Sequence, residues 1–283
     1  MRYGLTLPNA GSNGDAHTLA ELATLAEDAG WDGVFLEDYI VHHSAPDAPT
    51  YDPWLALAAI ACNTTRIRIG TSVTPLTRRR PWKLARETVT LDHLSNGRVI
   101  LGVGLGDLGD AGFAQVGEPT DNRQRARILD EALTVLTGLW SGEPFAFSGE
   151  HFQVDHVTLL PRPVQQPRIP IWVGGNWPHK GVMRRAARWD GFAGGKEHAP
   201  EEDWHLTAAE IREVKTCIAS QRTTPAPFDI VLGGAERSPD WEHDRALIRS
   251  AAESGATWWM EYVPVGELVY IRDCIARGPL RIG

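Results

Sequence analysis

The sequence predicts an α/β protein of one domain, residues 1–283, folded as a (β/α)8 TIM barrel with a β-hairpin inserted after the fourth helix. Short apolar runs rich in β-branched residues alternate eight times with segments of helical periodicity, as in parallel strands joined by helices. No repeat, linker or shift in composition interrupts this series. The 283 residues suit such a barrel, which typically needs about 250, and 42% apolar residues can fill its core.

The first two strand–helix units precede residue 65. In chain order, their elements are a strand over residues 2–7, a helix over 15–29, a strand over 32–37 and a helix from 52 to about 62. Asp52 and Pro53 begin the second helix, because an N-cap carboxylate accepts free backbone N–H groups and proline fits the first turn. Residues 38–51 have no periodicity and are expected to form a loop.

A strand–helix–strand unit over residues 66–107 is the centre of the prediction. Pro81 suits the first turn of its helix, and Gly97 suits the left-handed C-terminal cap. The second strand alternates little, as expected when both faces of a parallel strand are covered. A right-handed βαβ connection places the two strand ends, residues 71–75 and 104–107, side by side.

The second half of the chain completes the predicted barrel. Its expected elements are a helix over 122–140, a hairpin over 144–154, a strand over 169–173, a helix over 178–188, a strand over 191–193, a helix over 201–220, a strand over 229–232, a helix over 241–253, a strand over 257–262 and a helix over 266–277. The hairpin is indicated by alternation around Ser148 and Gly149.

Composition argues against several classes of protein. A formal net charge of −8 disfavours a nucleic-acid surface, which requires a basic face. No apolar run approaches the ~18 residues that span a bilayer, and the polar start indicates a strand instead of a signal peptide. Cys62, Cys217 and Cys274 are odd in number and far apart, so reduced thiols in a cytoplasmic protein are expected.

Candidate site residues follow from the rule that a barrel binds ligands at the C-terminal ends of its strands. The residues at these positions are Glu37, Asp38, Thr71 to Thr74, Leu105 to Asp107, Gly174 to Trp177, and Glu261. Residues 104–109 match G-x-G-x-x-G, but no helix follows them directly, so a dinucleotide fold is rejected. The glycines can instead bring the backbone close to a flat ring.

Three stretches carry a resemblance to a known family. RIRIGTSVTP, LARETVTLDHLSNGRVILGVGLGD and PRIPIWVGG with RRAARWDGF resemble the luciferase-like flavin-dependent monooxygenases and their deazaflavin-dependent oxidoreductase relatives. The likeness runs in order from the first strand to about Phe192, roughly two thirds of the chain, and TLDHLSNGR followed by LGVGLG is its most specific part.

The resemblance implies a cofactor site at the mouth of the barrel. The relatives carry a non-proline cis peptide at the position of Ser72–Val73, and its bulge supports the central ring of the cofactor. The other residues expected to bind the cofactor are Asp38, Thr74, Leu105, Gly106, Gly174, Gly175, Asn176 and Trp177. The segment from Gly174 leads into a helix whose N-terminus could hold a phosphate, and the indole of Trp177 is expected to line the pocket.

Candidate catalytic residues are His42, His43 and Asp107. A histidine in the loop after the second strand suits proton transfer near neutrality, although a surface histidine is an equal alternative. Several deazaflavin relatives have Asp-His and a later Glu where this chain has Asp38-Tyr39 and Asp107, which puts a sugar-phosphate dehydrogenase activity in doubt. No His-Glu-x-x-His or Cys-x-x-Cys spacing indicates a metal site.

The arginine run 78–80 follows the expected bulge. At least two of its three side chains are expected in solvent, while one could reach an anionic part of a cofactor or substrate.

The preferred hypothesis is a flavin-dependent oxidoreductase, a monooxygenase that uses reduced FMN and dioxygen on a small organic substrate. The alternative is hydride transfer with the deazaflavin coenzyme F-420, because the shared platform does not discriminate between the two rings. A non-catalytic flavin-binding protein or a barrel hydrolase is a further alternative, but no activated nucleophile or metal constellation stands out. The resemblance also implies a homodimer and a separate reductase that supplies the reduced cofactor.

Overall fold

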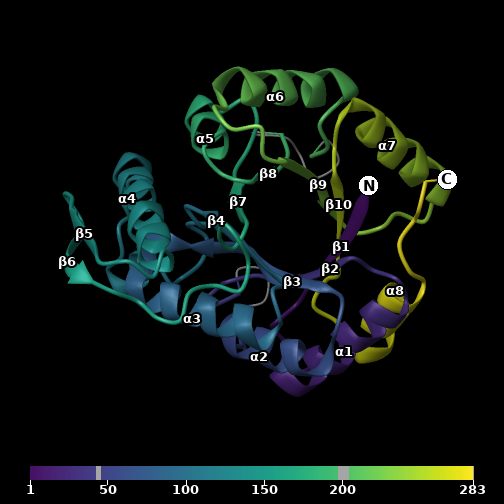
Figure 1. The fold of residues 1–283 in the computed structure, drawn as a ribbon. Coiled ribbons are helices and arrows are strands. Elements are labelled where there is room, and N and C mark those ends of the chain that lie inside the picture. The colour runs from purple at the N-terminus through teal and green to yellow at the C-terminus, as the bar shows by residue number, and fades with distance from the viewer. Residues whose placement is uncertain (43–45, 197–203, 283) are drawn as a thin grey trace.

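The computed structural model, which describes residues 1–42, 46–196 and 204–282, contains a closed barrel of eight parallel strands (Figure 1). The barrel strands are β1 (Arg2–Leu7), β2 (Gly33–Leu36), β3 (Arg68–Pro75), β4 (Val99–Gly104), β7 (Ile171–Gly174), β8 (Gly191–Ala193), β9 (Asp229–Ala235) and β10 (Trp258–Tyr262). Their order is β1-β10-β9-β8-β7-β4-β3-β2, and β1 pairs with both β2 and β10, which closes the sheet. The predicted (β/α)8 barrel is confirmed.

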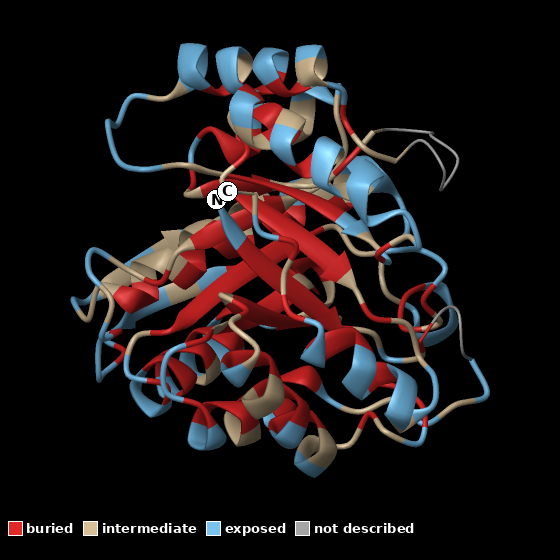
Figure 2. Cartoon of the chain, turned by 90° about the vertical axis from the view of Figure 1, so that its right-hand side faces the viewer, coloured by how far each residue is buried: buried red, intermediate tan, exposed pale blue. Residues whose placement is uncertain are grey.

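Helices surround the barrel, with their outer faces exposed and their inner faces buried (Figure 2). They are α1 (Ala16–Asp28), α2 (Pro53–Asn63), α3 (Pro81–Leu94), α4 (Asn122–Trp140), α5 (Lys180–Ala186), α6 (Ala208–Gln221), α7 (Trp241–Ser254) and α8 (Leu268–Ala276), with short 3-10 helices η1 (Leu76–Arg78) and η2 (Ala114–Val116). The antiparallel hairpin of β5 (Phe145–Ser148) and β6 (Gln153–Val157) lies beside α4, after the fourth helix as predicted. No helix among the described residues is both long and apolar enough to cross a bilayer.

Aspartate caps begin three of the helices in the first half of the chain. The side chain of Asp15 accepts backbone N–H groups at the start of α1, and Asp52 and Asp121 do the same for α2 and α4. Such caps satisfy donors that the first turn leaves unpaired. The boundaries predicted at Asp52 and Asn122 are therefore those of the structure.

Two helices in the second half begin later than the sequence indicated. The helix expected over 201–220 starts at Ala208, because Thr207 and Glu210 form a capping box there; residues 201–203 lie outside the described part. The helix expected over 178–188 is only the seven residues of α5. A helix of this length gives no support to the phosphate site expected at its N-terminus.

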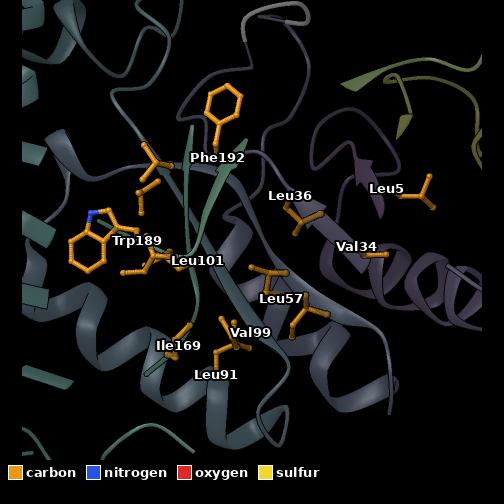
Figure 3. Close-up of a cluster of buried hydrophobic side chains, with 14 of the residues drawn as sticks. Leu5, Val34, Leu36, Leu57, Leu91, Val99, Leu101, Ile169, Trp189 and Phe192 are labelled. Atoms are coloured by element: carbon orange, nitrogen blue, oxygen red, sulfur yellow. The ribbon is translucent and has the colours of Figure 1, made fainter. Parts of the chain in front are cut away.

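Two apolar layers stabilise the barrel. The larger one lies between the strands and the helices, where leucine, valine and isoleucine side chains from α2, α3 and the neighbouring strands meet (Figure 3). Inside the barrel, Trp172 lies 5.2 Å from Phe35 and 5.1 Å from Trp258, measured between ring centroids. Trp258 and Trp172 belong to the first half of their strands. These rings fill the N-terminal half of the barrel and leave open space at the C-terminal mouth.

A buried carboxylate fixes the start of β3 at the opposite end of the barrel. Glu27, on the last turn of α1, accepts hydrogen bonds from the backbone N–H groups of Thr65, Arg66 and Ile67, at 2.5–3.1 Å. Burial opposes ionisation of this carboxyl, but the hydrogen bonds outweigh burial and lower its pKa.

We expect Glu27→Gln to lower the free energy of unfolding by about 2 kcal/mol at pH 7, since hydrogen bonds to a charged group are lost. The folded-state pKa is lowered, so this stabilisation is present above the ordinary glutamate pKa of about 4.3 and is lost as the pH falls through the folded value. Urea unfolding between pH 3 and 7 measures the difference. Glu21→Gln, an exposed position on the same helix, is the control, and a pH-independent difference would contradict the argument.

Candidate functional site

A cavity of about 760 Å³ opens at the C-terminal mouth of the barrel. Residues at or just beyond the ends of all eight barrel strands line it, from Thr6 of β1 to Met260 of β10. The sequence-based location of the site, at the ends of β3 and β4, therefore falls within this cavity.

The floor of the cavity is a bulge in β3. The peptide bond between Ser72 and Val73 is cis, as the resemblance implied, and the pairing of β3 with β4 shifts register between Thr71 and Thr74. The side chain of Val73 packs against glycines of the neighbouring strands. A Cβ added to Gly104 would lie 2.8 Å from Val73 Cγ2, and one added to Gly174 would lie 2.7 Å from Val73 Cγ1. Glycine at positions 104 and 174 therefore leaves the room that the side chain of Val73 needs in the bulge.

One wall of the cavity is built from backbone. We call it the glycine wall; it consists of Gly174, Gly175, Gly194, Gly233 and Gly234, at the ends of β7, β8 and β9. A Cβ at Gly194 would lie 1.8 Å from the carbonyl oxygen of Gly175, and Gly233 has a φ of +97°, so larger residues do not fit these two positions. Only Gly174 and Gly175 were expected from the sequence. The recurrence of Gly-Gly near the ends of three successive strands was the signal for the rest.

The arc of the mouth from β2 to β4 carries carboxylates; its β2 end lies across the barrel from β8, and its β4 end adjoins β7. We call it the acidic wall; it consists of Glu37 and Tyr39 after β2 and Asp107 after β4, all of which line the cavity. Burial raises the pKa of Tyr39, and the negative charges of Glu37 and Asp107 raise it further, so its hydroxyl stays protonated. Burial and Glu37 likewise raise the pKa of the nearby Tyr262. The wall combines hydrogen-bond acceptors with a neutral phenol.

His42 does not lie where a direct catalytic role requires. His42 is fully buried and does not line the cavity; its Nε2 atom lies 3.2 Å from Oε2 of Glu37. It therefore reaches the site through Glu37, whose side chain is 15% exposed. His43, the second predicted histidine, lies outside the described residues. Glu37 was noted in the sequence as a strand-end residue but was not chosen as catalytic.

The arginine run forms internal ion pairs, so the expectation of at least two solvated side chains was wrong. Arg79 binds both carboxylate oxygens of Asp38, at 2.6 and 2.8 Å. Arg78 binds the carboxylate of Asp110 and the carbonyl oxygen of Asp38, and only Arg80 is exposed. Asp38 lines the cavity as predicted, but its carboxylate is occupied by Arg79. Sequence spacing gave no sign of these pairs, because the partners are 32 to 41 residues apart.

Four other predicted mouth residues do not line the cavity. Thr71 and Thr74 are fully buried, and Thr74 donates a hydrogen bond from Oγ1 to Thr71 Oγ1 at 3.0 Å. Trp177 packs against the apolar core, and Glu261 is buried in an ion pair with Arg237. Strand alternation sends Glu261 outward while its neighbour Met260 faces the cavity.

The remaining predicted residues do line the cavity. They are Ser72, Val73, Leu105, Gly106, Asp107, Gly174, Gly175 and Asn176. Arg125, which is 1% exposed, fixes the loop after β4 by donating hydrogen bonds to the carbonyl oxygens of Leu105 and Gly106 at 2.5 and 2.7 Å. Arg185 of α5 also lines the cavity and pairs with Asp130, Nε to Oδ1, at 2.7 Å.

A planar ring with an anionic tail fits this arrangement. The bulge offers backbone to the face of a ring, and the glycine wall offers close backbone approach with Arg185 nearby. A metal fits less well. Within the described residues, Glu131, Glu150 and His151 come within ligand distance of one another, but Glu131 already accepts the backbone N–H groups of residues 150–152 and so caps the hairpin.

Comparison with known proteins assigns the chain to a family. The family model of luciferase-like monooxygenases matches residues 1–259, and the chain belongs to this family of oxidoreductases. An F420-dependent glucose-6-phosphate dehydrogenase of Nakamurella multipartita is 36% identical over 186 residues, which are 64% of this chain and 53% of that protein. The chain spans about half the length of the curated relatives of this kind that it matches.

Two solved structures share the fold. An F420-dependent secondary alcohol dehydrogenase in complex with an F420-acetone adduct matches with a TM-score of 0.79 and 17% identity, over 99% of each chain. A monooxygenase from Streptomyces bottropensis matches with a TM-score of 0.74 and 18% identity, over 97% of this chain and 96% of that one. At these identities the likeness concerns the fold alone.

We expect Arg79→Met to lower the free energy of unfolding by about 3 kcal/mol, because it leaves the buried carboxylate of Asp38 without its bidentate partner. Chemical denaturation measures this loss. Arg80→Met, at the exposed neighbouring position, should change stability by less than about 0.5 kcal/mol. Equal losses in the two variants would contradict the buried pairing.

Proposed function

We propose that the protein is a deazaflavin-dependent oxidoreductase that transfers a hydride between coenzyme F-420 and a small organic substrate. The observation that carries this proposal is the 36% identity to an F420-dependent dehydrogenase, in a chain whose mouth holds a backbone bulge and a glycine wall. This order differs from that expected from the sequence, where reduced FMN with dioxygen came first. FMN is the second candidate, because the family model is that of luciferase-like monooxygenases.

Different residues of the mouth would bind the ring of the cofactor, its tail and the substrate. In the proposed complex, the Ser72–Val73 bulge would support the ring, and the glycine wall and Arg185 would hold the anionic tail. The open backbone of the glycine wall lets a tail approach closely, while the N–H groups of Gly175 and Gly194 already donate within the sheet and Arg185 shares its charge with Asp130. The carboxylates of the acidic wall would repel an anionic tail. The substrate then occupies the space beside Glu37 and Tyr39. When bound, the deazaflavin supplies or accepts the hydride.

The proposal extends to partners and location. A hydride-transfer enzyme of this kind needs no separate reductase for its own turnover, whereas the FMN monooxygenase alternative needs one. The homodimer, the cytoplasmic location and a role without nucleic acid or membrane contacts stay predictions from the sequence and the family.

We expect the purified protein to bind F-420 in preference to FMN, measured by titration with each cofactor and quenching of its fluorescence. Gly104→Ala should weaken F-420 binding about tenfold, because its new methyl group displaces Val73; overpacking costs about 1–3 kcal/mol, and 1.4 kcal/mol is tenfold. Gly266→Ala, where a Cβ meets no atom closer than 3.9 Å, is the matched control. Binding of FMN without binding of F-420 would contradict the proposal and favour the monooxygenase.

A further inference from the structure

A carboxylate and a buried imidazole form a pair at the acidic wall. Glu37 follows β2 directly, lines the cavity and keeps 15% of its side chain exposed, while His42 behind it has none exposed. The ring N–H at Nε2 of His42 can donate to Oε2 of Glu37 across 3.2 Å, which leaves Oε1 to accept a hydrogen bond from a ligand. The backbone N–H of His42 also donates to Oγ1 of Thr50 at 3.1 Å, which fixes the segment that carries the imidazole.

The arginines near this wall already have other partners. Arg78 and Arg79 are bound to Asp110 and Asp38, and these four charges cancel in pairs. Arg125 is buried and directed at backbone carbonyl oxygens. Among the hydrogen bonds and ion pairs of the described residues, the carboxylates of Glu37 and Asp107 have no arginine or lysine partner. Burial lowers the pKa of the Arg125 guanidinium overall, while its interaction through space with Asp107 raises that pKa, so Glu37 is the carboxylate of this wall that no arginine or lysine in the described part of the chain offsets.

The geometry points to Glu37 as the group that exchanges a proton with the substrate, with His42 as its positioning residue and an uncharged alcohol, or the matching carbonyl compound, as the substrate. This inference rests on the proposed function. None of His42, His43 and Asp107, the residues selected from the sequence, has this role in it.

The alcohol loses its proton and its hydride to two different acceptors. The alcohol donates its hydroxyl hydrogen bond to Oε1 of Glu37. As the carbinol carbon gives up a hydride to the oxidised deazaflavin, the hydroxyl proton passes to Glu37 and the C–O bond becomes a carbonyl. The products are the ketone or aldehyde, the reduced deazaflavin and a protonated Glu37; the reverse direction returns the same proton. Tyr39, which stays protonated, can donate a hydrogen bond to the same substrate oxygen.

The charge of the acidic wall also selects the substrate. A phosphate monoester beside Glu37 and Asp107 would meet two carboxylates, and its charge would have to be balanced by groups that are already paired. An uncharged alcohol needs only the acceptor of Glu37 and the donor of Tyr39. We therefore expect this chain to differ from its glucose-6-phosphate dehydrogenase relatives in substrate class.

The test measures reduction of F-420 by propan-2-ol, butan-2-ol, cyclohexanol, glucose and glucose 6-phosphate. We expect at least one uncharged alcohol to give a kcat/KM at least tenfold above that of glucose 6-phosphate. Glu37→Gln should then lower kcat about 100-fold or more, the usual contribution of proton transfer, with F-420 affinity unchanged within twofold. Glu253→Gln, an exposed carboxylate on α7, is the control and should keep full activity.

Two variants of His42 test its positioning role. His42→Leu should lower kcat while leaving KM for the alcohol and the affinity for F-420 unchanged, and His42→Gln, which keeps an N–H donor, should restore most of kcat. Thermal melting of each variant checks that the fold is kept, and Glu37→Gln provides the test if His42→Leu does not fold.

The outcomes separate the inference from the function on which it rests. Protein that binds no F-420 overturns the proposed function and the inference with it. Protein that binds F-420 but reduces it with none of the uncharged alcohols, or only with glucose 6-phosphate, overturns the substrate class. Activity of Glu37→Gln equal to that of the wild type overturns the role of Glu37 alone.

Discussion

The packing of Val73 against glycine is the constraint on which the mouth of the barrel depends. The bulge in β3 turns this side chain toward β4 and β7, where Gly102, Gly104 and Gly174 leave the space that it fills. A methyl group at Gly104 or Gly174 would approach Val73 within 3 Å, closer than packed carbon atoms allow. The floor of the cavity is thus made of backbone from three adjacent strands, and a flat ligand can lie against it.

The cavity is divided by charge. Glycine pairs lie near the ends of β7, β8 and β9, with Arg185 close by, whereas Glu37 and Asp107 follow β2 and β4, beside a protonated Tyr39. This difference would orient a ligand with an anionic tail, because the carboxylates repel the tail toward the glycine pairs. The ion pairs of the arginine run maintain it by holding two guanidinium groups away from the open cavity.

Much of this was predictable, because strands, helices and caps depend on residues close in sequence. The Asp52 cap and the central βαβ unit with its glycine-rich ends follow from local spacing. The Gly-Gly pairs at 194 and 233 could have been found in the same way, since each lies near the C-terminal end of a strand. The start of α6 was wrong by about seven residues because the capping box at Thr207 was not recognised.

By itself, the sequence determined the barrel, the hairpin after the fourth helix, the position of the mouth and, through resemblance, the cis bulge. Tertiary structure alone decided which polar residues reach the cavity. Arg79 finds Asp38 across 41 residues, and His42 is buried behind Glu37, although both would suit a ligand. The physical reason is that a buried charge must have a partner, and the partner that lies closest in space need not be close in the chain.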